Sequence, residues 1–178
     1  MTRAVSCQGH RPPTAALALR DAAFTRTLVA FLIPSGMPVR VVIDTNVFVG
    51  ACLGQGAAAE VLRRCLTGAV QPLMGSALLA EYEDVLARSD LMQSSRLTAA
   101  ERDELLDIFM ARCEWTRVYF GWRPNLPDEA DNHLVELAVA GGAQVIVTRN
   151  LRDFARAELN FPGLRCLAPG PFLKEMAP

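Results

Sequence analysis

Four short segments of the sequence place a carboxylate where an apolar run ends or a helix begins. The first is VVIDTNVFVG (residues 41–50), in which Asp44 closes a β-branched run. Proteins that alternate strands and helices bind ligands at the carboxyl ends of their strands. Thr45 and Asn46 follow directly and can hydrogen-bond to the carboxylate and orient it. Asp44 is therefore a candidate site residue, although an aspartate here can also serve only to form a turn or cap a helix.

The second segment is SALLAEYEDVLAR (residues 76–88), whose apolar positions repeat with the period of a helix. Glu81 borders this apolar stripe, one turn after Leu78 and one turn before Val85. Glu83 falls on the outer face and is expected to be solvated. A carboxylate aimed at the edge of a core is costly unless it is paired or bound to metal. Glu81 is therefore the second candidate.

The third segment is LPDEADNHLVELA (residues 126–138), which holds Asp128 and Asp131. A spacing of three residues puts the two carboxylates one turn apart on the same face of a helix. In a purely structural interpretation, Asp128 caps the helix and Asp131 favours its positive end. That interpretation fits Asp128 well and fits Asp131 less well, because Asp131 aligns with the apolar Leu134 on the buried side.

The fourth segment is VIVTRNLRDF (residues 145–154), in which a strand closes with Thr148 and Asn150 before Asp153. No single segment is specific, but together they describe a cluster. Carboxylates gathered at neighbouring strand ends repel one another unless a cation lies between them. Oxygen ligands suit Mg²⁺ or Mn²⁺ better than zinc or copper. Such a site catalyses phosphoryl chemistry by ionising water and stabilising charge on the phosphate.

Composition excludes several other chemistries. The chain has only two histidines, so histidine acid–base pairs and Ser-His-Asp triads are nearly excluded. Its five cysteines are widely spaced and form no C-x-x-C pair, which favours reduced thiols over disulfides or zinc. The net charge of −1 carries no global nucleic-acid signal, so any RNA site must be a local one.

The elements that position these residues alternate between strands and helices. Alternation of this kind predicts an α/β fold with a parallel sheet covered on both faces. Ser76 is expected to cap its helix, and Thr98 and Glu101 form a capping box. Strands are expected at residues 39–43, 70–74, 115–120, 145–147 and 165–167. Helices are expected at residues 57–66, 76–88, 98–110, 129–140 and 172–176.

Residues 1–36 differ from the rest, with four arginines against one acid and a Pro-Pro pair. They are interpreted either as an over-read of the start site, since Met37 directly precedes the first expected strand, or as a disordered or loosely helical extension. A targeting segment is conceivable from the charge bias. The apolar run at residues 28–33 is too short to cross a bilayer. The expectation is therefore one domain over residues 37–178, with no membrane association and a cytoplasmic location.

The four segments resemble those of PIN domains, and specifically the toxin-like branch of bacterial type II toxin–antitoxin systems. The matched stretches are residues 41–51, 76–88, 128–143 and 147–154, and the resemblance covers roughly residues 39–176. It implies a three-layer α/β/α domain with a central twisted parallel sheet. It further implies an endoribonuclease that uses Mg²⁺ or Mn²⁺, a small antitoxin partner and, by analogy, a homodimer.

Carried onto this sequence, the resemblance assigns Asp44, Glu81 and Asp131 to the three acids of the family. Asp128 matches an acid often found just before the third. The place of the family's fourth acid is taken by Asn150, and Asp153 is a possible substitute among the metal ligands. Thr148 matches a small polar residue near the site.

Arg149 and Arg152 are candidate contacts for RNA phosphates, although as surface charges they could equally have no role. Asn150 keeps a second interpretation open, in which the chain is a PIN-fold RNA-binding or interaction module with weakened or lost catalysis. A haloacid-dehalogenase-like phosphatase also begins with a strand and an aspartate, but it needs D-x-D, and Asn46 takes the second place. The sequence has no Gly-rich phosphate loop with lysine, which excludes a nucleotide-driven ATPase.

Overall fold

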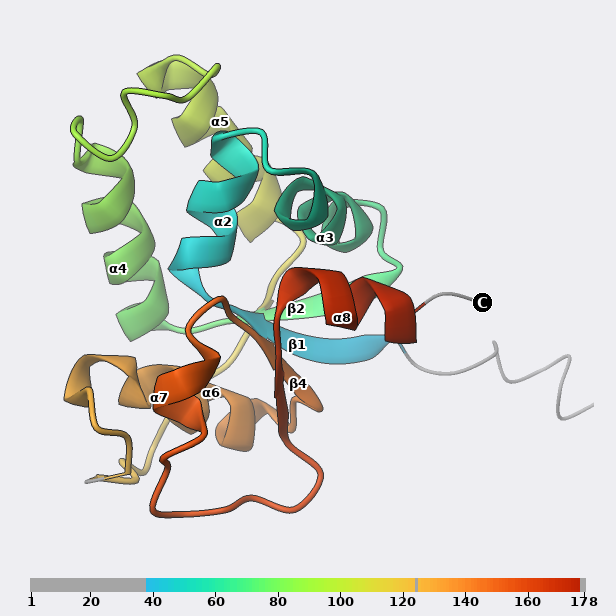
Figure 1. The fold of residues 1–178 in the computed structure, drawn as a ribbon, viewed down its shortest axis with the longest axis vertical. Helices are drawn as coiled ribbons and strands as arrows, with labels where there is room; N and C mark the ends of the chain where they lie inside the picture. The colour runs from blue at the N-terminus through green and yellow to red at the C-terminus, as the bar shows by residue number, and fades with distance from the viewer. Residues whose placement is uncertain (1–37, 124, 177–178) are drawn as a thin grey trace, which may run out of the picture. The chain divides into compact units, whose positions relative to one another are not determined.

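The structure is a computed structural model that describes residues 38–123 and 125–176. The expectations for residues 1–36 lie outside these residues. Within them, strands and helices alternate from Val39 to Glu175, as the sequence predicts (Figure 1).

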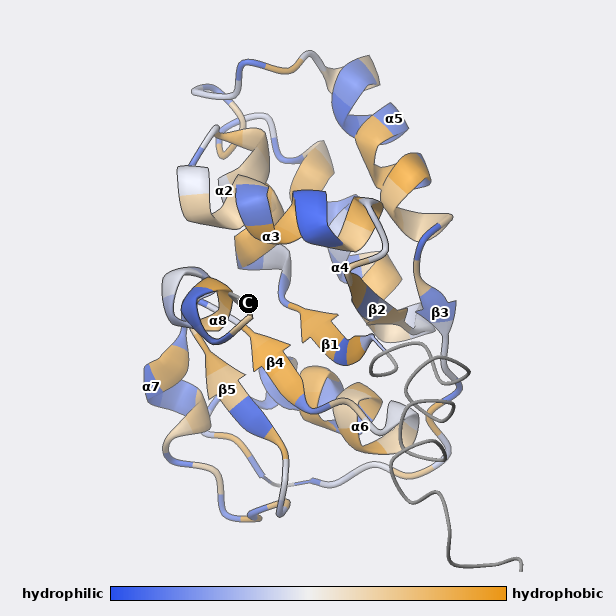
Figure 2. Ribbon diagram, turned by 90° about the vertical axis from the view of Figure 1, so that its right-hand side faces the viewer, coloured by the Kyte–Doolittle hydropathy of each residue, from blue (hydrophilic) through white to orange (hydrophobic). Residues whose placement is uncertain are grey.

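A parallel five-stranded sheet with the order β3-β2-β1-β4-β5 forms the centre of this region. The strands are β1 (Val39–Ile43), β2 (Val70–Met74), β3 (Glu114–Trp115), β4 (Val145–Val147) and β5 (Arg165–Leu167). Val41 of the central strand pairs with Pro72 on one side and Val145 on the other. β4 is hydrophobic along its length, and β1 is hydrophobic apart from Arg40 near its start (Figure 2), as expected for strands covered on both faces.

Helices cover both faces of the sheet, which confirms the predicted α/β class. One face is covered by α6 (Asn132–Gly141), which follows the 3₁₀ turn η1 (Glu129–Asp131), and α7 (Leu151–Phe154) follows β4. The other helices are α2 (Thr45–Cys52), α3 (Gly56–Leu66), α4 (Ser76–Ala87), α5 (Ala99–Met110) and α8 (Pro169–Glu175). In the described part of the chain, no helix is both long enough and apolar enough to span a bilayer.

An aromatic cluster holds α2, α4 and α5 together above the sheet. The ring of Phe48 lies 5.0 Å from that of Tyr82 and 5.5 Å from that of Phe109. Burial of such side chains stabilises the fold by roughly 1.5–3 kcal/mol each. The buried Tyr82 hydroxyl also donates a 3.0 Å hydrogen bond to the carbonyl oxygen of Ile43. This bond fixes α4 to the carboxyl end of β1.

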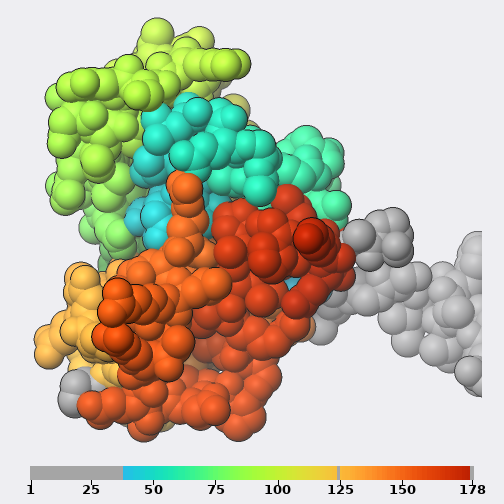
Figure 3. Space-filling model, in the orientation of Figure 1, coloured from blue at the N-terminus to red at the C-terminus, as the bar shows by residue number. Residues whose placement is uncertain are grey.

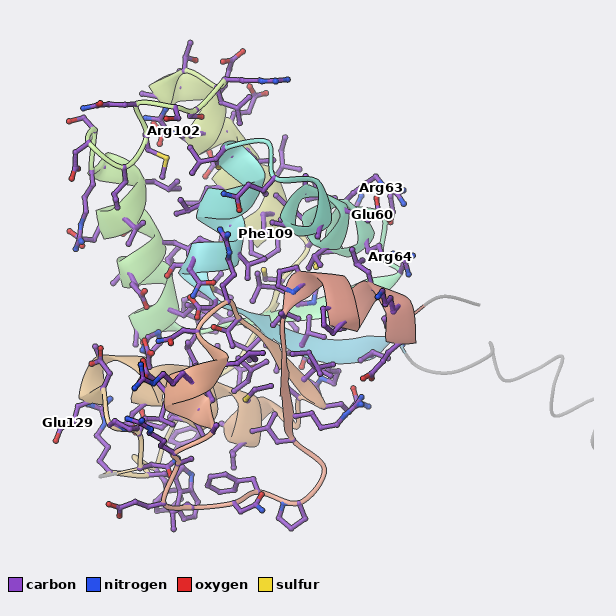
Figure 4. The ribbon with its side chains drawn as sticks, viewed as in Figure 1. Glu60, Arg63, Arg64, Arg102, Phe109 and Glu129 are labelled. Carbon is purple, nitrogen blue, oxygen red and sulfur yellow. The ribbon has the colours of Figure 1, made fainter. Side chains whose placement is uncertain are left out.

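The charged outer face of α3 forms a local network of its own. Glu60 accepts hydrogen bonds from Arg63 at 2.7 Å and from Arg64 at 3.2 Å, and all three side chains project from the same helix (Figure 4). Arg64 also donates to the carbonyl oxygen of Met176 at 3.0 Å, which ties α8 to α3. These arginines therefore have structural partners.

Several predicted boundaries are confirmed and two are wrong. Thr98 and Glu101 form the predicted capping box, and α6 ends at Gly142, whose φ of 63° suits glycine. Ser76 does not cap α4: the helix begins at Ser76 and its N-cap is Gly75. The strand predicted at residues 115–120 ends after Trp115, because its partner β2 ends at Met74 and the chain then turns into α4.

Candidate active site

Asp44 lies at the carboxyl ends of two neighbouring strands, β1 and β4. It follows β1, its backbone N–H donates to the Val147 carbonyl oxygen at 3.0 Å, and its side chain caps α2. Its carboxylate accepts hydrogen bonds from Asn46 N at 2.9 Å, Asn46 Nδ2 at 2.8 Å and Thr148 Oγ1 at 2.6 Å. Burial raises the pKa of Asp44 and the charge of Glu81 adds to the rise, although the hydrogen bonds oppose it. The site thus holds a buried carboxylate whose charge is unfavourable without a cation.

Glu81 approaches from α4, one residue before the anchored Tyr82. Its Oε1 accepts a 2.5 Å hydrogen bond from Thr45 Oγ1, and its Oε2 lies 2.9 Å from His133 Nε2. Burial alone would raise the pKa of Glu81, but the contacts with His133 and Thr45 outweigh it and lower the pKa. Glu81 is therefore held in its charged form, facing the strand end that carries Asp44.

Asp131 ends the η1 turn on the opposite side of the site. Its Oδ2 accepts from Asn150 Nδ2 at 3.3 Å, and the same amide donates to Asp153 Oδ2 at 2.5 Å. Burial raises the pKa of Asp131 to about 6, with further contributions from the charges of Asp44, Asp128 and Glu81. Asn150 thus links two acids through its amide group, where a carboxylate would have repelled both.

The remaining predicted residues lie at the margin of this group. Asp128 is exposed and caps η1 by accepting from Ala130 N at 3.0 Å, and its charge acts on Asp131. The backbone N–H of Arg149 donates to Asn46 Oδ1 at 3.1 Å, which holds the end of β4 against α2. Arg149 and Arg152 are both exposed. The space-filling view shows part of α2 (cyan) at the surface between α4 (green) and α7 (orange) (Figure 3).

His133 belongs to the site and was missed by reasoning from the sequence. Besides its contact with Glu81, its Nδ1 lies 2.6 Å from the carbonyl oxygen of Ala130. Burial alone would lower the pKa of His133, but Glu81, Ala130 and Asp131 together raise it. The available signal was its position two residues after Asp131, in the run D-N-H of residues 131–133.

The carboxylate oxygens at this site are the type of ligand that a divalent cation binds. Asp44 and Glu81 both raise the pKa of Asp131, so the three acids lie close enough to repel one another, and their oxygens are the ligands that Mg²⁺ and Mn²⁺ prefer. Among residues 38–123 and 125–176, no three acidic, cysteine or histidine side chains already surround a single point. Glu81 would have to exchange its contact with Thr45 or His133 for an ion.

Similarity to known proteins agrees with this geometry. A family model of the PIN domain matches residues 40–152, which is well over half of the chain. The chain belongs to the PIN-domain family. The matched range of this PIN domain includes Asp44, Glu81 and Asp131, whereas Asp153 lies one residue beyond it.

The fold of this PIN domain also occurs among solved structures. One similar chain comes from the crystal structure of VapBC2 from Rickettsia felis bound to a DNA fragment from their promoter. The alignment covers 73% of this chain and 98% of the other, with 19% sequence identity and a TM-score of 0.51, which supports the shared fold. The comparison with curated proteins gives no significant match.

Proposed function

We propose that this PIN domain is a divalent-metal-dependent endoribonuclease that hydrolyses RNA phosphodiesters. The observation that carries the proposal is the rise in the pKa of Asp131 to about 6, caused by burial and by the charges of Asp44 and Glu81. These acids come from three separate segments, and the fold brings them into mutual repulsion. A cluster of this kind is stabilised by a cation, and perturbed carboxylates are typical of functional sites.

Each residue has a distinct role in this proposal. Asp44, Glu81 and Asp131 would hold Mg²⁺ or Mn²⁺, which supplies a lowered pKa for water and charge stabilisation at the phosphate. Thr45 orients Glu81, and Thr148 orients Asp44, through the hydrogen bonds described above. Asn46 also orients Asp44. Asp128 and Asp153 add negative charge beside Asp131. Asn150 links Asp131 to Asp153.

The substrate is proposed to approach over the carboxyl ends of β1 and β4. Arg149 and Arg152 flank this edge, and their exposed guanidinium groups suit RNA phosphates, because an acidic centre alone would repel the backbone.

A toxin role follows from the VapBC2 likeness together with the PIN family. In that role a small antitoxin inhibits the enzyme by placing an arginine or lysine among Asp44, Glu81 and Asp131, where it satisfies the carboxylates and excludes RNA. We further infer a cytoplasmic location and a homodimer that leaves both sites accessible. Expression in a bacterial host should arrest growth, and the Asp44→Asn form should not.

The decisive experiment incubates the full chain with a set of RNAs in Mg²⁺, in Mn²⁺ and in excess EDTA. Cleavage with either metal and none with the chelator is expected. Undiminished cleavage in EDTA would contradict the metal-dependent mechanism.

One observation favours a second function, an RNA-binding or interaction module with weakened or lost catalysis. Asn150 occupies the place between Asp131 and Asp153 with a neutral amide, which removes one charge that a second ion would need. Absence of cleavage with both metals, combined with retained RNA binding, would select this function.

A further inference from the structure

The segment between β3 and η1 exposes an unusual number of large rings. We call residues 115–123, WTRVYFGWR, the aromatic segment. Five of the nine exposed large hydrophobic residues in the described part of the chain lie within it, and Tyr119 and Phe120 are each 78% exposed. The segment contains two arginines and no acid. Exposed apolar area of this density marks a binding surface more often than an incidental feature.

Both ends of the aromatic segment are fixed to the domain. Thr116 N donates to the Met74 carbonyl oxygen at 2.8 Å, which continues the pairing with β2. At the other end, the buried Glu136 of α6 accepts from Trp122 N at 3.1 Å and from Arg123 Nε at 2.9 Å. Because both ends are held, the side chains between them are presented on a defined backbone.

Glycine at position 121 permits this anchoring. A Cβ atom there would lie 3.2 Å from Glu136 Oε1, so a side chain at this position would require the carboxylate to shift. Trp122 packs edge-on against Phe161 with ring centroids 5.4 Å apart, and this contact holds the aromatic segment against the domain. Tyr119 and Phe120 have no aromatic neighbour among the described residues, and their ring faces are free.

The aromatic segment borders the candidate active site. A pocket of about 250 Å³ lies between residues 115–119, the first turn of α4 and the α6 residues His133, Glu136 and Leu137. His133 is a wall of this pocket, and its Nε2 lies 2.9 Å from Glu81. A chain that passes from the acids across His133 therefore reaches Tyr119.

We propose that the aromatic segment binds unpaired bases of a single-stranded RNA whose scissile phosphate lies at the acidic site. This proposal rests on the proposed ribonuclease function and names its substrate class. Aromatic faces stack on any unpaired base, and Arg117 beside them can pair with a phosphate. A duplex keeps its bases stacked inside, so it cannot use Tyr119 and Phe120 in this way. Arg123 is paired with Glu136, but Arg117 forms no ion pair with any of the described residues, and its positive charge beside the two exposed rings favours a polyanion over a protein partner as the occupant.

Binding can be measured without cleavage by using the full chain with Asp44→Asn in the presence of EDTA. The probes are a fluorescent single-stranded RNA without self-complementarity and a duplex RNA of the same length. The test variant combines Tyr119→Ala and Phe120→Ala, and the conservative variant combines Tyr119→Phe and Phe120→Tyr. Ile108→Ala, on the exposed side of α5, is a matched control because Ile108 is 47% exposed and lies outside the site.

Loss of both rings should weaken single-strand binding by about tenfold or more, since stacking contributes about 1–3 kcal/mol per base. The conservative variant and Ile108→Ala should bind like the parent protein. Arg117→Gln should reduce the slope of log affinity against log salt by about 0.7, the contribution of one phosphate contact on a single strand. Thermal unfolding of each variant separates lost binding from lost folding.

Unchanged single-strand affinity in the folded double alanine variant would overturn the proposal, as would equal losses for single-stranded and duplex RNA. A change in oligomeric state by light scattering, with RNA affinity intact, would instead identify the aromatic segment as an interface between copies of the chain. Ring-dependent binding by a wild-type chain that cleaves no RNA would contradict the nuclease proposal and leave the base-binding surface standing. Cleavage of single-stranded RNA at the wild-type rate by the double alanine variant would contradict the base-binding surface and leave the nuclease proposal standing.

Discussion

His133 Nε2 lies 2.9 Å from Glu81 Oε2, while His133 Nδ1 lies 2.6 Å from the carbonyl oxygen of Ala130. Both neighbours are hydrogen-bond acceptors, so each ring nitrogen is best satisfied when it carries a proton. This arrangement favours the imidazolium form, in agreement with the raised pKa of His133. When His133 is protonated, a cation therefore lies beside Oε2 of Glu81, while Thr45 contacts Oε1.

The contact between His133 and Glu81 predicts that His133→Gln loses stability in a pH-dependent way. A histidine whose pKa is raised on folding stabilises the protein fully below its unfolded pKa of about 6.5, and this contribution is lost as pH rises through the folded value. Thermal unfolding should therefore show a larger deficit of the variant at pH 6 than at pH 9. The difference should become smaller in a Glu81→Gln background, in which only Ala130 and Asp131 still raise the pKa of His133. A deficit independent of pH would indicate a packing role only.

Asp44→Asn should abolish cleavage and leave the fold intact. Asparagine keeps the shape and one acceptor oxygen for the Asn46 backbone N–H. Thr148 can reorient its hydroxyl, whereas the side-chain amide of Asn46 loses its acceptor and has to turn away. Removing a buried charge also relieves the unfavourable desolvation that raises the pKa of Asp44, so Tm should be unchanged or higher. The loss of activity should exceed the 10- to 100-fold typical of residues outside a metal's ligand set. Circular dichroism and a cleavage assay would test both parts.

Glu81→Gln and Glu83→Gln form a matched pair on α4. Glu81 faces Thr45 and His133, whereas Glu83 is exposed on the outer face of the same helix. Cleavage rates should fall strongly in the first variant and remain close to wild type in the second. Comparable damage from Glu83→Gln would show that the helix presents a different face to the substrate.

The raised pKa of Asp131 predicts that the thermal stability of the protein depends on pH and on bound metal. Its pKa is raised from an ordinary value of 3.8 to about 6, so the folded state disfavours its charge. The resulting destabilisation grows as pH rises from about 4 to 6 and is complete above that range. Without metal, Asp131→Asn should have a higher Tm than wild type at pH 7.5 and a similar Tm near pH 4.

Addition of Mg²⁺ extends the same experiment. It should raise the Tm of wild type at pH 7.5, less so below pH 6, because Asp131 must lose its proton to bind a cation. Asp131→Asn should gain little from the ion. A metal-free variant less stable than wild type at pH 7.5 would contradict the mutual repulsion of the acids.

Removal of residues 1–36 should leave folding and cleavage unchanged. The first core strand begins at Val39, and the core of the described region runs from Val41 to Phe172. Cooperative thermal unfolding at the wild-type temperature would support the prediction. Loss of soluble protein would show that the extension is part of the fold.

The sequence predicted β1 and β4 well because both are short and rich in β-branched apolar residues, as in Val39–Ile43 and Val145–Val147. The sequence did not predict the helix α2, because VFVG in residues 47–50 suits a strand as well as a helix. There Asp44 decides the outcome, because its side chain caps the helix. The short α7 was missed because four residues give no periodicity to read.

Part of the site was equally accessible from the sequence. Asp44 and Glu81 were identifiable from a strand end and a helix face, and Asp131 from its alignment with Leu134 on the buried side of the predicted helix, although the structure places it in the η1 turn before α6. The contact between Glu81 and His133 was not, because it joins residues 52 positions apart and depends on how α4 meets α6. The role of Asn150 as a donor to two acids likewise required coordinates.

The hydrogen bond from Tyr82 to the Ile43 carbonyl has a consequence for motion during turnover. Tyr82 adjoins Glu81, and Ile43 adjoins Asp44, so one buried bond sets the spacing of the two backbones that carry these acids. Sliding α4 along β1 would break this bond inside the core, and Glu81 and Asp44 can therefore adjust only by side-chain rotation. Asp131 and Asp153 lie on short elements, η1 and α7, that have few internal hydrogen bonds. The backbones that carry Asp44 and Glu81 are thus coupled, and we expect any opening that admits substrate or releases product to occur on the side of η1 and α7.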